Sequence, residues 1–282
     1  MNRRYSFAMA LIGAMALAGS AAAQPSSTPS LIDSPLVVNL GTFAFTTDLE
    51  ARLNGQSTSN PDVDFDKVFG LGDNANRVRA DALWRITPRH HLRFLYFDNS
   101  RTKTRTLGQP INWGDLTFQP GSSVSATNRF KIAEVAYEYA FWRKPDTEVA
   151  GSIGVHYADI SLKLAGAATT TDGSGNVGQT QFAVKESSLP APLPVIGLRA
   201  VTRVSQSVYL DAQGQLFRAK VGGYKGSLYD LRAGATWMFG RHLGAGLGYN
   251  RFVTRLDVDR TSFTGQLRMG YSGLQLYLTG VL

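Results

Sequence analysis

Apolar and polar residues alternate with a period of two through most of the chain. Over residues 77–86 the even positions are apolar and the odd positions are mostly charged, and further along Tyr229 and Leu231 alternate with Asp230 and Arg232. Successive side chains of a strand point to opposite faces, so this period predicts strands with one apolar and one polar face. The expected strands span residues 37–53, 77–87, 91–106, 122–142, 148–164, 194–203, 207–221, 227–239, 242–257 and 262–282.

Two features favour a membrane barrel over a soluble β-sandwich, which also alternates. Aromatic residues such as Trp84, Trp142 and Trp237 stand at the ends of predicted strands, as the interfacial girdle of a barrel requires. Short connections also alternate with long polar ones, the arrangement of periplasmic turns and external loops. The long connections are residues 54–76, 106–123 and 165–185.

The strand count predicts how the barrel closes. Ten is an even number, so an antiparallel ring would close with both ends of the chain in the periplasm. Ser272-Gly273 reads as a bulge within the last strand, and a turn there would change the count, so eight or twelve strands remain alternatives. The Pro-rich segment 189–194 cannot donate ladder hydrogen bonds at its prolines, so we expect it at the outer rim.

The first residues read as an export signal. Arg3 and Arg4 precede an apolar run over residues 7–17, and small residues follow at positions 20–23. This pattern predicts a cleaved signal peptide, residues 1–23, followed by a flexible Ser- and Pro-rich leader, residues 24–35, and the barrel, residues 36–282. Beyond the signal, no apolar run reaches the roughly 18 residues that a membrane helix needs.

Composition narrows the chemistry. The 282 residues include no Cys, which excludes a disulfide scaffold, a thiolate zinc site and a Cys nucleophile. The formal net charge is +8, but Lys and Arg are dispersed through the strands and form no cluster of the kind that binds nucleic acid.

The last strand adds a family resemblance. Leu274, Leu276 and Leu278 alternate with polar residues up to the final Leu282, a pattern similar to the C-terminal strand that outer-membrane barrels present to their assembly machinery. The mature chain resembles small Gram-negative outer-membrane β-barrels of the OmpA-transmembrane-like and opacity types, and residues 64–92 resemble an uncharacterised proteobacterial group. The resemblance implies an outer-membrane location. It implies as partners the barrel-assembly machinery, periplasmic chaperones, outer-membrane lipid and lipopolysaccharide, with a monomer favoured.

His156 is the best candidate for an enzyme of the lipid-modifying kind. Ser152 would share its face, but Ala158 stands where the His-x-Ser-Asn signature of lipid A deacylases has Ser. A single His without partners is not a triad, so we expect His156 to be a lumen residue bonded to a neighbouring strand. His90 and His91 are expected in or beside a solvated periplasmic turn. The sequence thus predicts a protein that is not an enzyme.

Asp62, Asp64 and Asp66 alternate in the first long loop and suggest a calcium site. An EF-hand-like loop needs Gly at its sixth position and Glu at its twelfth, where this chain has Lys67 and Asp73. We therefore expect a short strand with one solvated face, and neither a metal nor a cofactor.

Arg101, Lys103 and Arg105 alternate with threonines at the upper end of the third predicted strand. The apolar even positions below them face outward, so this basic row should point to the mouth of the lumen, where it could attract anions or pair with Asp115. A bulge would instead turn it outward to lipopolysaccharide phosphates.

The polar faces of the predicted strands also carry charges of both signs. Such charges are tolerable inside a barrel only if they are paired or hydrated. The lumen charges predicted by alternation are Arg77, Arg79, Asp81, Arg85, Glu134, Glu138, Asp230 and Arg232. The favoured function is a non-enzymatic envelope or surface-interaction role. A narrow passive channel for small, anionic solutes and a lipid-modifying hydrolase are the alternatives.

Overall fold

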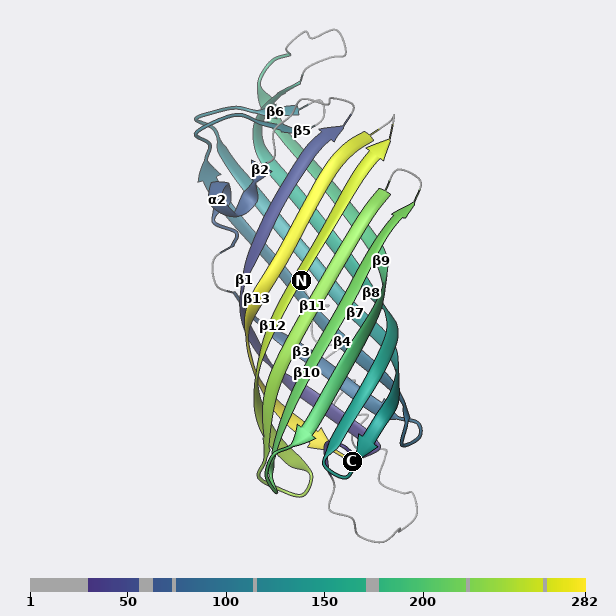
Figure 1. The fold of residues 1–282 in the computed structure, drawn as a ribbon. Helices are drawn as coiled ribbons and strands as arrows, with labels where there is room; N and C mark the ends of the chain where they lie inside the picture. The colour runs from purple at the N-terminus through teal and green to yellow at the C-terminus, as the bar shows by residue number, and fades with distance from the viewer. Residues whose placement is uncertain are drawn as a thin grey trace.

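Ten long strands form a closed antiparallel ring in the computed structural model (Figure 1). The structure describes residues 30–55, 63–72, 75–113, 116–170, 178–221, 224–260 and 263–282. The wall strands are β1 (Leu36–Gly55), β3 (Ala75–Arg85), β4 (His90–Thr106), β7 (Ser123–Lys144), β8 (Thr147–Thr170), β9 (Gln181–Arg203), β10 (Val208–Val221), β11 (Tyr224–Met238), β12 (Leu243–Arg260) and β13 (Phe263–Val281).

The ring closes because the last strand, β13, pairs with the first, β1, and every other wall strand pairs with its neighbour in sequence. The prediction of a ten-stranded antiparallel barrel is confirmed. The register between β1 and β13 runs through Thr46↔Ser272 and Phe45↔Gly273 without a break, so these residues lie within one strand and the count stays at ten.

The Pro-rich segment lies inside a strand, so the expected start of this strand at residue 194 was wrong. β9 begins at Gln181 and pairs with β8 throughout, including Tyr157↔Pro192 and Val155↔Pro194. Its pairing with β10 stops at Ile196↔Leu216. Pro190, Pro192 and Pro194 occupy alternate positions and lack N–H groups on the same edge, so the prolines leave β9 unpaired with β10 over this stretch.

A short helix fills a gap in the wall on the other side of the ring. β3 is shorter than its neighbours, so the upper parts of β1 and β4 have no strand between them. The segment of β2 (Val63–Asp64) and α2 (Phe65–Phe69) occupies this place, and β2 pairs with β1 at Glu50↔Asp64. The short strand expected around Asp64 and Asp66 is therefore only two residues long, and a helix capped by Asp64 follows it.

Contacts with both flanking strands hold the α2 segment in place. The Leu49 backbone N–H donates to Asp66 at 2.6 Å, and a guanidinium nitrogen of Arg101 donates to the Leu71 carbonyl at 3.0 Å. Phe65 and Phe69 are fully buried against the inner face of the barrel. Burial of Asp66 and repulsion from Asp48 and Asp64 raise its carboxyl pKa to about 7.

A second insertion covers the same end of the barrel. The strands β5 (Ile111–Trp113) and β6 (Leu116–Phe118) pair with each other, and β6 also pairs with the upper end of β8. Their apolar side chains are buried in the cluster that includes the inner faces of β1, β4 and β7. We call this the loop end of the barrel, and the opposite end, where the short connections lie, the turn end (Figure 1).

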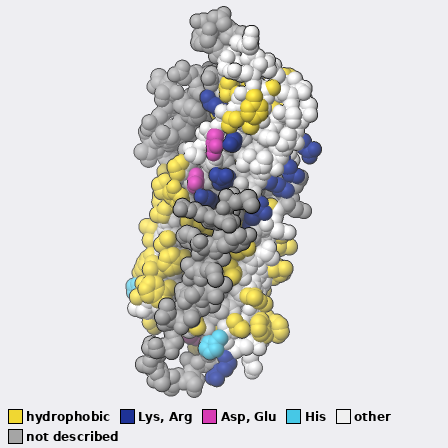
Figure 2. Space-filling model, turned by 180° about the vertical axis from the view of Figure 1, so that it is seen from behind, with side chains coloured by type: hydrophobic (Ala, Val, Ile, Leu, Met, Phe, Trp, Pro, Cys, Tyr) yellow, Lys and Arg dark blue, Asp and Glu magenta, His cyan; other side chains and the backbone are white. Residues whose placement is uncertain are grey.

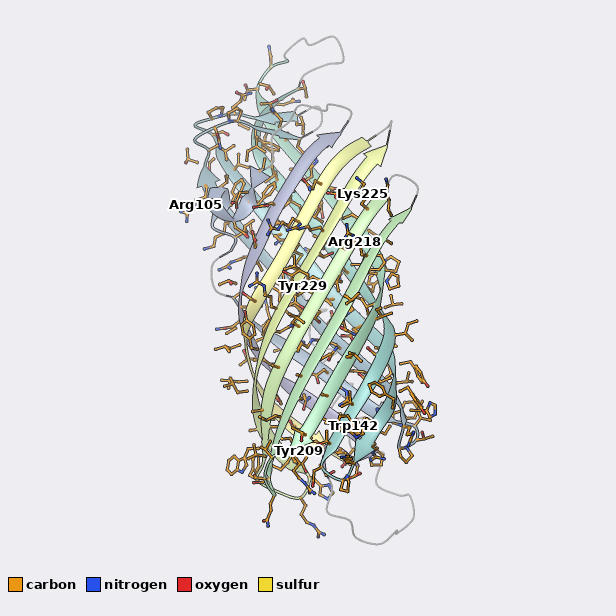
Figure 3. All side chains as sticks on the ribbon, in the orientation of Figure 1. Arg105, Trp142, Tyr209, Arg218, Lys225 and Tyr229 are labelled. Carbon is orange, nitrogen blue, oxygen red and sulfur yellow. The ribbon has the colours of Figure 1, made fainter. Side chains whose placement is uncertain are left out.

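The outer wall carries an apolar belt. Outward positions in its lower part are exposed aliphatic and aromatic residues, such as Val135, Ile153, Leu231, Leu247 and Leu276. Aromatic residues gather at the turn end, where Trp142 lies (Figure 3). Seen from behind, hydrophobic side chains cover much of the lower half, and most visible Lys and Arg side chains lie above it (Figure 2).

The N-terminal residues that the structure describes pack into the turn end. Residues 30–35 are the end of the leader expected to be flexible, but Ile32 is buried with Val201 and Tyr209 at the base of the lumen. Arg143 holds this segment through an ion pair of 2.6 Å to Asp33. The predicted signal peptide lies outside the described residues. In the described part of the chain, no helix is long and apolar enough to cross a membrane.

Candidate functional site

The candidate site is the lumen, where side chains form three layers between the turn end and the loop end. Inward positions follow the strand period, so one parity of each strand supplies the lining. The apolar cluster around Ile32 lies lowest, beside the lowest charged residues, since its member Val201 pairs with Glu148. Charged residues occupy the middle, and aromatic residues lie above them.

The charged layer has a lower cluster near the turn end. Arg199 donates to Glu138 at 2.7 Å and to Glu148 at 2.6 Å, and Arg85 approaches Glu148 at 3.4 Å. His91 lies between the same two carboxylates at 3.9 and 3.8 Å and is fully buried. The expectation that His91 is solvated was therefore wrong. β4 begins at His90, so the next residue already points into the lumen.

An upper cluster continues the charged layer. Arg232 contacts both Asp230 and Glu134, the latter at 2.8 Å. Arg93 connects the two clusters, because it lies 3.0 Å from Glu134 and 3.1 Å from Glu138. Both carboxylates are completely buried, so these guanidinium groups offset the cost of removing two anions from water.

Arg79 differs from the other lumen arginines. It is buried and donates to Asn250 at 2.6 Å, and its guanidinium lies 5.2 Å from the centre of the Phe43 ring. Among the described residues no carboxylate lies within ion-pair distance of it. The negatively polarised face of the Phe43 ring therefore partly takes the place of a carboxylate partner for the Arg79 guanidinium.

His156 belongs to this polar layer and not to a nucleophile–base pair. Its Nε2 lies 2.9 Å from the amide oxygen of Gln215 and 3.5 Å from Glu134. An amide oxygen can only accept, so Nε2 carries the proton and donates. Ser152 is not among the hydrogen-bond partners of His156 in the described part of the chain.

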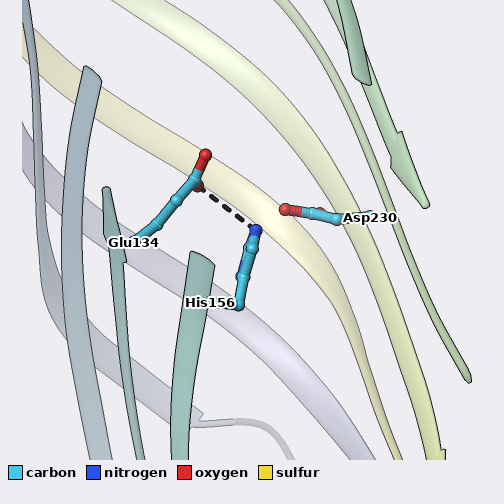
Figure 4. Close-up of side chains that lie close together, drawn as sticks. All are labelled: Glu134, His156 and Asp230. Carbon is cyan, nitrogen blue, oxygen red and sulfur yellow. Dashed lines mark ion pairs between the residues drawn. The ribbon is translucent and has the colours of Figure 1, made fainter. Parts of the chain in front are cut away.

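Glu134, His156 and Asp230 come close enough together to suggest a metal site (Figure 4). One potential ligand atom from each lies within 4.8 Å of the others. Glu134 already accepts from Arg93, Arg232 and Gln215. Guanidinium groups on the same oxygens would repel a cation, so the electrostatics favour an ion-pair network over a metal centre.

The layer above is aromatic. Its ring centroids are 4.9 to 6.2 Å apart, in stacked and edge-to-face arrangements. Its members are Phe43, Phe45, Phe97, Phe130, Phe252 and Tyr271, and all are buried. They come from β1, β4, β7, β12 and β13, and they lie above the charged layer.

A cavity of about 130 Å³ remains in the lower half of the lumen. Asp81, Asp211 and Gln213 line it together with Tyr277. Asn39 donates to Asp81 at 2.7 Å, and the Tyr277 hydroxyl lies 2.8 Å from that of Thr236. The lining is mixed, because Val37 and Val201 of the Ile32 cluster border the cavity together with these polar groups.

The structure places the sequence-predicted residues as follows. Seven of the eight predicted lumen charges lie in the charged layer or beside the cavity, and Arg77 lies higher, half-buried, donating to the carbonyls of Asn76 and Ser100. In the basic row, Arg101 and Lys103 are half-buried and Arg105 is exposed (Figure 3). Arg101 supports the α2 segment. Asp62, Asp73 and Asp115 lie outside the described residues.

Several residues of the lumen network are not predicted in that role from the sequence, four of them at the charged clusters. These four are His91, Arg93, Glu148 and Arg199. Arg93 and Arg199 have the inward parity of their strands, so alternation applied to every strand could have found them. His91 and Glu148 stand next to turns, where the position of the strand end decides whether a side chain is solvated.

Comparison with known proteins shows the fold. No family model matches the sequence, and no curated protein is significantly similar to it. The solved structure of outer membrane protease OmpT from Escherichia coli matches with a TM-score of 0.54 at 12% identity, over 92% of this chain and 99% of that one.

Two further matches have lower scores. The P. putida toluene transporter TodX has a TM-score of 0.36 at 8% identity, over 89% of this chain and 90% of that one. Ail of Yersinia pestis has a TM-score of 0.26 at 7% identity, over 86% and 98%. The closed ring, its apolar belt and the match to OmpT together show that the chain has the fold of an outer-membrane β-barrel.

Proposed function

We propose that this protein is an integral outer-membrane barrel with a closed lumen and a non-enzymatic role in the envelope, exerted through its loop end and outer wall. The observation that carries the proposal is the stack of three layers in the lumen. The middle layer joins carboxylates and guanidinium groups from both halves of the ring, and aromatic rings lie directly above it. Such a network stiffens the barrel and leaves little room for solute.

The channel alternative has less support. A ten-stranded barrel is just wide enough for side chains to fill or for a narrow water path. Here the cavity of about 130 Å³ lies between the Ile32 cluster and the charged layer. The row expected to attract anions at the mouth is also not free, because Arg101 is bonded to the α2 segment.

For the hydrolase alternative, no nucleophile lies beside the candidate base among the residues that the structure describes. His156 is buried and bonded to Gln215 and Glu134. A protease site on the external rim would need a His there. The chain has four His, of which three lie at the turn end and His156 lies within the lumen.

An outer-membrane barrier assay in a strain lacking the protein tests this role. We expect increased uptake of a lipophilic dye, restored to normal by the wild-type chain and equally by His156→Gln. His242→Gln, at a turn, serves as the matched control. An unchanged barrier in the deletion strain would contradict an envelope role, and failure of His156→Gln alone, with the variant folded, would favour the hydrolase.

A further inference from the structure

Six basic side chains face outward on neighbouring strands, on the part of the wall nearer the loop end. They are Arg218 and Lys220 of β10, Lys225 of β11, Arg251 and Arg255 of β12, and Arg268 of β13, and we call them the wall patch. Five are exposed and Arg268 is half-exposed. Figure 3 shows Arg218 and Lys225 in the upper half of the barrel, above Tyr229.

The register places like charges directly opposite each other. Lys220 pairs with Lys225 between β10 and β11, and Arg255 pairs with Arg268 between β12 and β13. Directly opposed side chains of an antiparallel pair are about 5 Å apart at Cβ, and like charges there are destabilising. The same register places Asp257 opposite Lys225 and Glu50 opposite Arg268, so each pair has one acidic neighbour and two basic groups. The remaining positive charge indicates a surface that is stabilised when an anion lies against it.

The acidic groups on the same wall do not balance the patch. Three acids face outward among these six basic residues, namely Asp48, Glu50 and Asp257. Arg268 approaches Glu50 at 3.4 Å. Within the described part of the chain, none of the other five basic residues forms an ion pair. The patch therefore keeps a positive excess.

The wall is also hollowed at the patch. A hollow of about 270 Å³ is lined by Glu50, Arg255, Gln266 and Arg268. A second hollow of about 140 Å³ is lined in part by Arg251, Arg268 and Gly270. Arg268 thus borders two hollows, and each has a second guanidinium group at its edge.

The height of the patch identifies its occupant. Along β11, the outward side chains between Tyr229, below the patch, and Trp237, near the turn end, are apolar, and these two residues are eight residue steps apart. At about 3.4 Å per residue and a tilt of roughly 40°, that stretch spans about 20 Å of height, close to the roughly 25 Å apolar band of outer-membrane barrels. By register, five of the six patch residues are level with positions 225–227 of β11, just beyond this stretch on the loop side and at the level of outer-leaflet headgroups, whereas Arg251 lies opposite Leu231 at its upper margin.

We propose that the wall patch binds the phosphate groups of a phosphorylated outer-leaflet lipid, with lipopolysaccharide as the occupant. Guanidinium and ammonium groups form short charge-assisted hydrogen bonds with phosphate, and Arg can do so with two parallel bonds. This inference rests on the membrane orientation of the proposed function, but not on whether the lumen is closed. The bound lipid would relieve both like-charge pairs and anchor β10–β13 in the leaflet.

The test compares two folded triple variants in detergent micelles with EDTA. The patch variant removes the centre of the patch and is Lys220→Gln/Arg255→Gln/Arg268→Gln. The control variant removes three exposed charges at the turn end and is Arg89→Gln/Lys144→Gln/Arg241→Gln. Affinity is measured for bisphosphorylated lipid A, for dephosphorylated lipid A and for inorganic phosphate. We expect the patch variant to bind bisphosphorylated lipid A at least about tenfold more weakly than wild type, since one charge-assisted bond is worth roughly that factor.

Thermal unfolding gives a second, independent readout. Without lipid, the patch variant should be at least as stable as wild type, because like-charge repulsion is relieved, whereas bisphosphorylated lipid A should stabilise wild type and the control more than the variant. Should the triple variant not fold, the double variant Arg255→Gln/Arg268→Gln is expected to give the same results.

Two outcomes would overturn the proposal: equal affinities of the patch and control variants for bisphosphorylated lipid A, or equally strong binding of dephosphorylated lipid A by the wild type. Binding of inorganic phosphate alone would also overturn it and would indicate a site for free anions. Ion conduction by a protein that still binds lipid A would contradict the closed lumen of the proposed function, but it would not contradict lipid binding at the wall patch.

Discussion

Single residues decide how the charges inside the barrel are tolerated. Arg93 is 7% exposed in its side chain and lies between two carboxylates with no exposure at all. Alternation assigns Glu134 and Glu138 to the inner face, and they lie there. Their partners could not be read from the sequence, since Arg232 bonds Glu134 across 98 residues and only the stagger of the closed ring brings the two together.

Replacing Arg93 with Met should therefore lower the free energy of unfolding by about 3–5 kcal/mol, because two buried carboxylates each lose a partner. The measurement is urea unfolding of the protein in lipid vesicles. Arg77→Met is the matched control, since Arg77 bonds only exposed backbone carbonyls, and a change within about 0.5 kcal/mol is expected. Equal effects of the two substitutions would argue against the network.

Asp66 makes the packing of α2 depend on pH. Burial and neighbouring acids raise its pKa to about 7 from an ordinary value of 3.8. The packed state therefore holds a proton that the unpacked segment releases near pH 4, and its stability falls as the pH rises from about 4 to about 7. We expect amides of residues 65–70 to exchange hydrogen more slowly at pH 5 than at pH 8, after correction for intrinsic rates. Asp66→Asn should remove the difference, and a persistent pH dependence in that variant would exclude Asp66 as its source.

At the scale of elements, the period of two was enough to predict all ten wall strands. It failed at the additions to the wall. The α2 segment was read as a strand because Asp64 and Asp66 alternate with apolar residues, but Asp64 caps a helix whose Phe65 and Phe69 are one turn apart. The length of β3 decides that choice, since a short strand leaves a gap that a helix fills, and such a tertiary cause is not visible in a local window.

The prolines of β9 offer a direct test of why β9 and β10 separate. Continuing the register past Ile196↔Leu216 would place Pro194 opposite Arg218 and Pro192 opposite Lys220. Replacing Pro190, Pro192 and Pro194 with Thr restores three donors on that edge. We expect slower hydrogen exchange at residues 217–221 of β10, with residues 224–228 of the next strand as an internal reference. Unchanged exchange at 217–221 would show that the prolines do not cause the separation.

At the scale of the whole molecule, the inner and outer surfaces have opposite chemistry. The outer wall is apolar with a basic patch toward the loop end, and the lumen holds paired charges below stacked rings. Sequence alternation predicts both surfaces, but it cannot predict whether the lumen is open. Whether the lumen is open depends on whether inward side chains from different strands contact one another across it. Arg93 and Glu134 do so in the charged layer, and Phe43 and Phe97 do so in the aromatic layer.

The most direct test of the closed lumen is single-channel conductance of the mature protein, refolded and shown by gel mobility to be folded, in a planar bilayer. The three layers predict a silent bilayer for the wild-type chain, with a known porin as the positive control for insertion. Discrete conductance steps that recur with pure, folded protein would contradict the closed lumen, and their size would measure the path that the three layers leave.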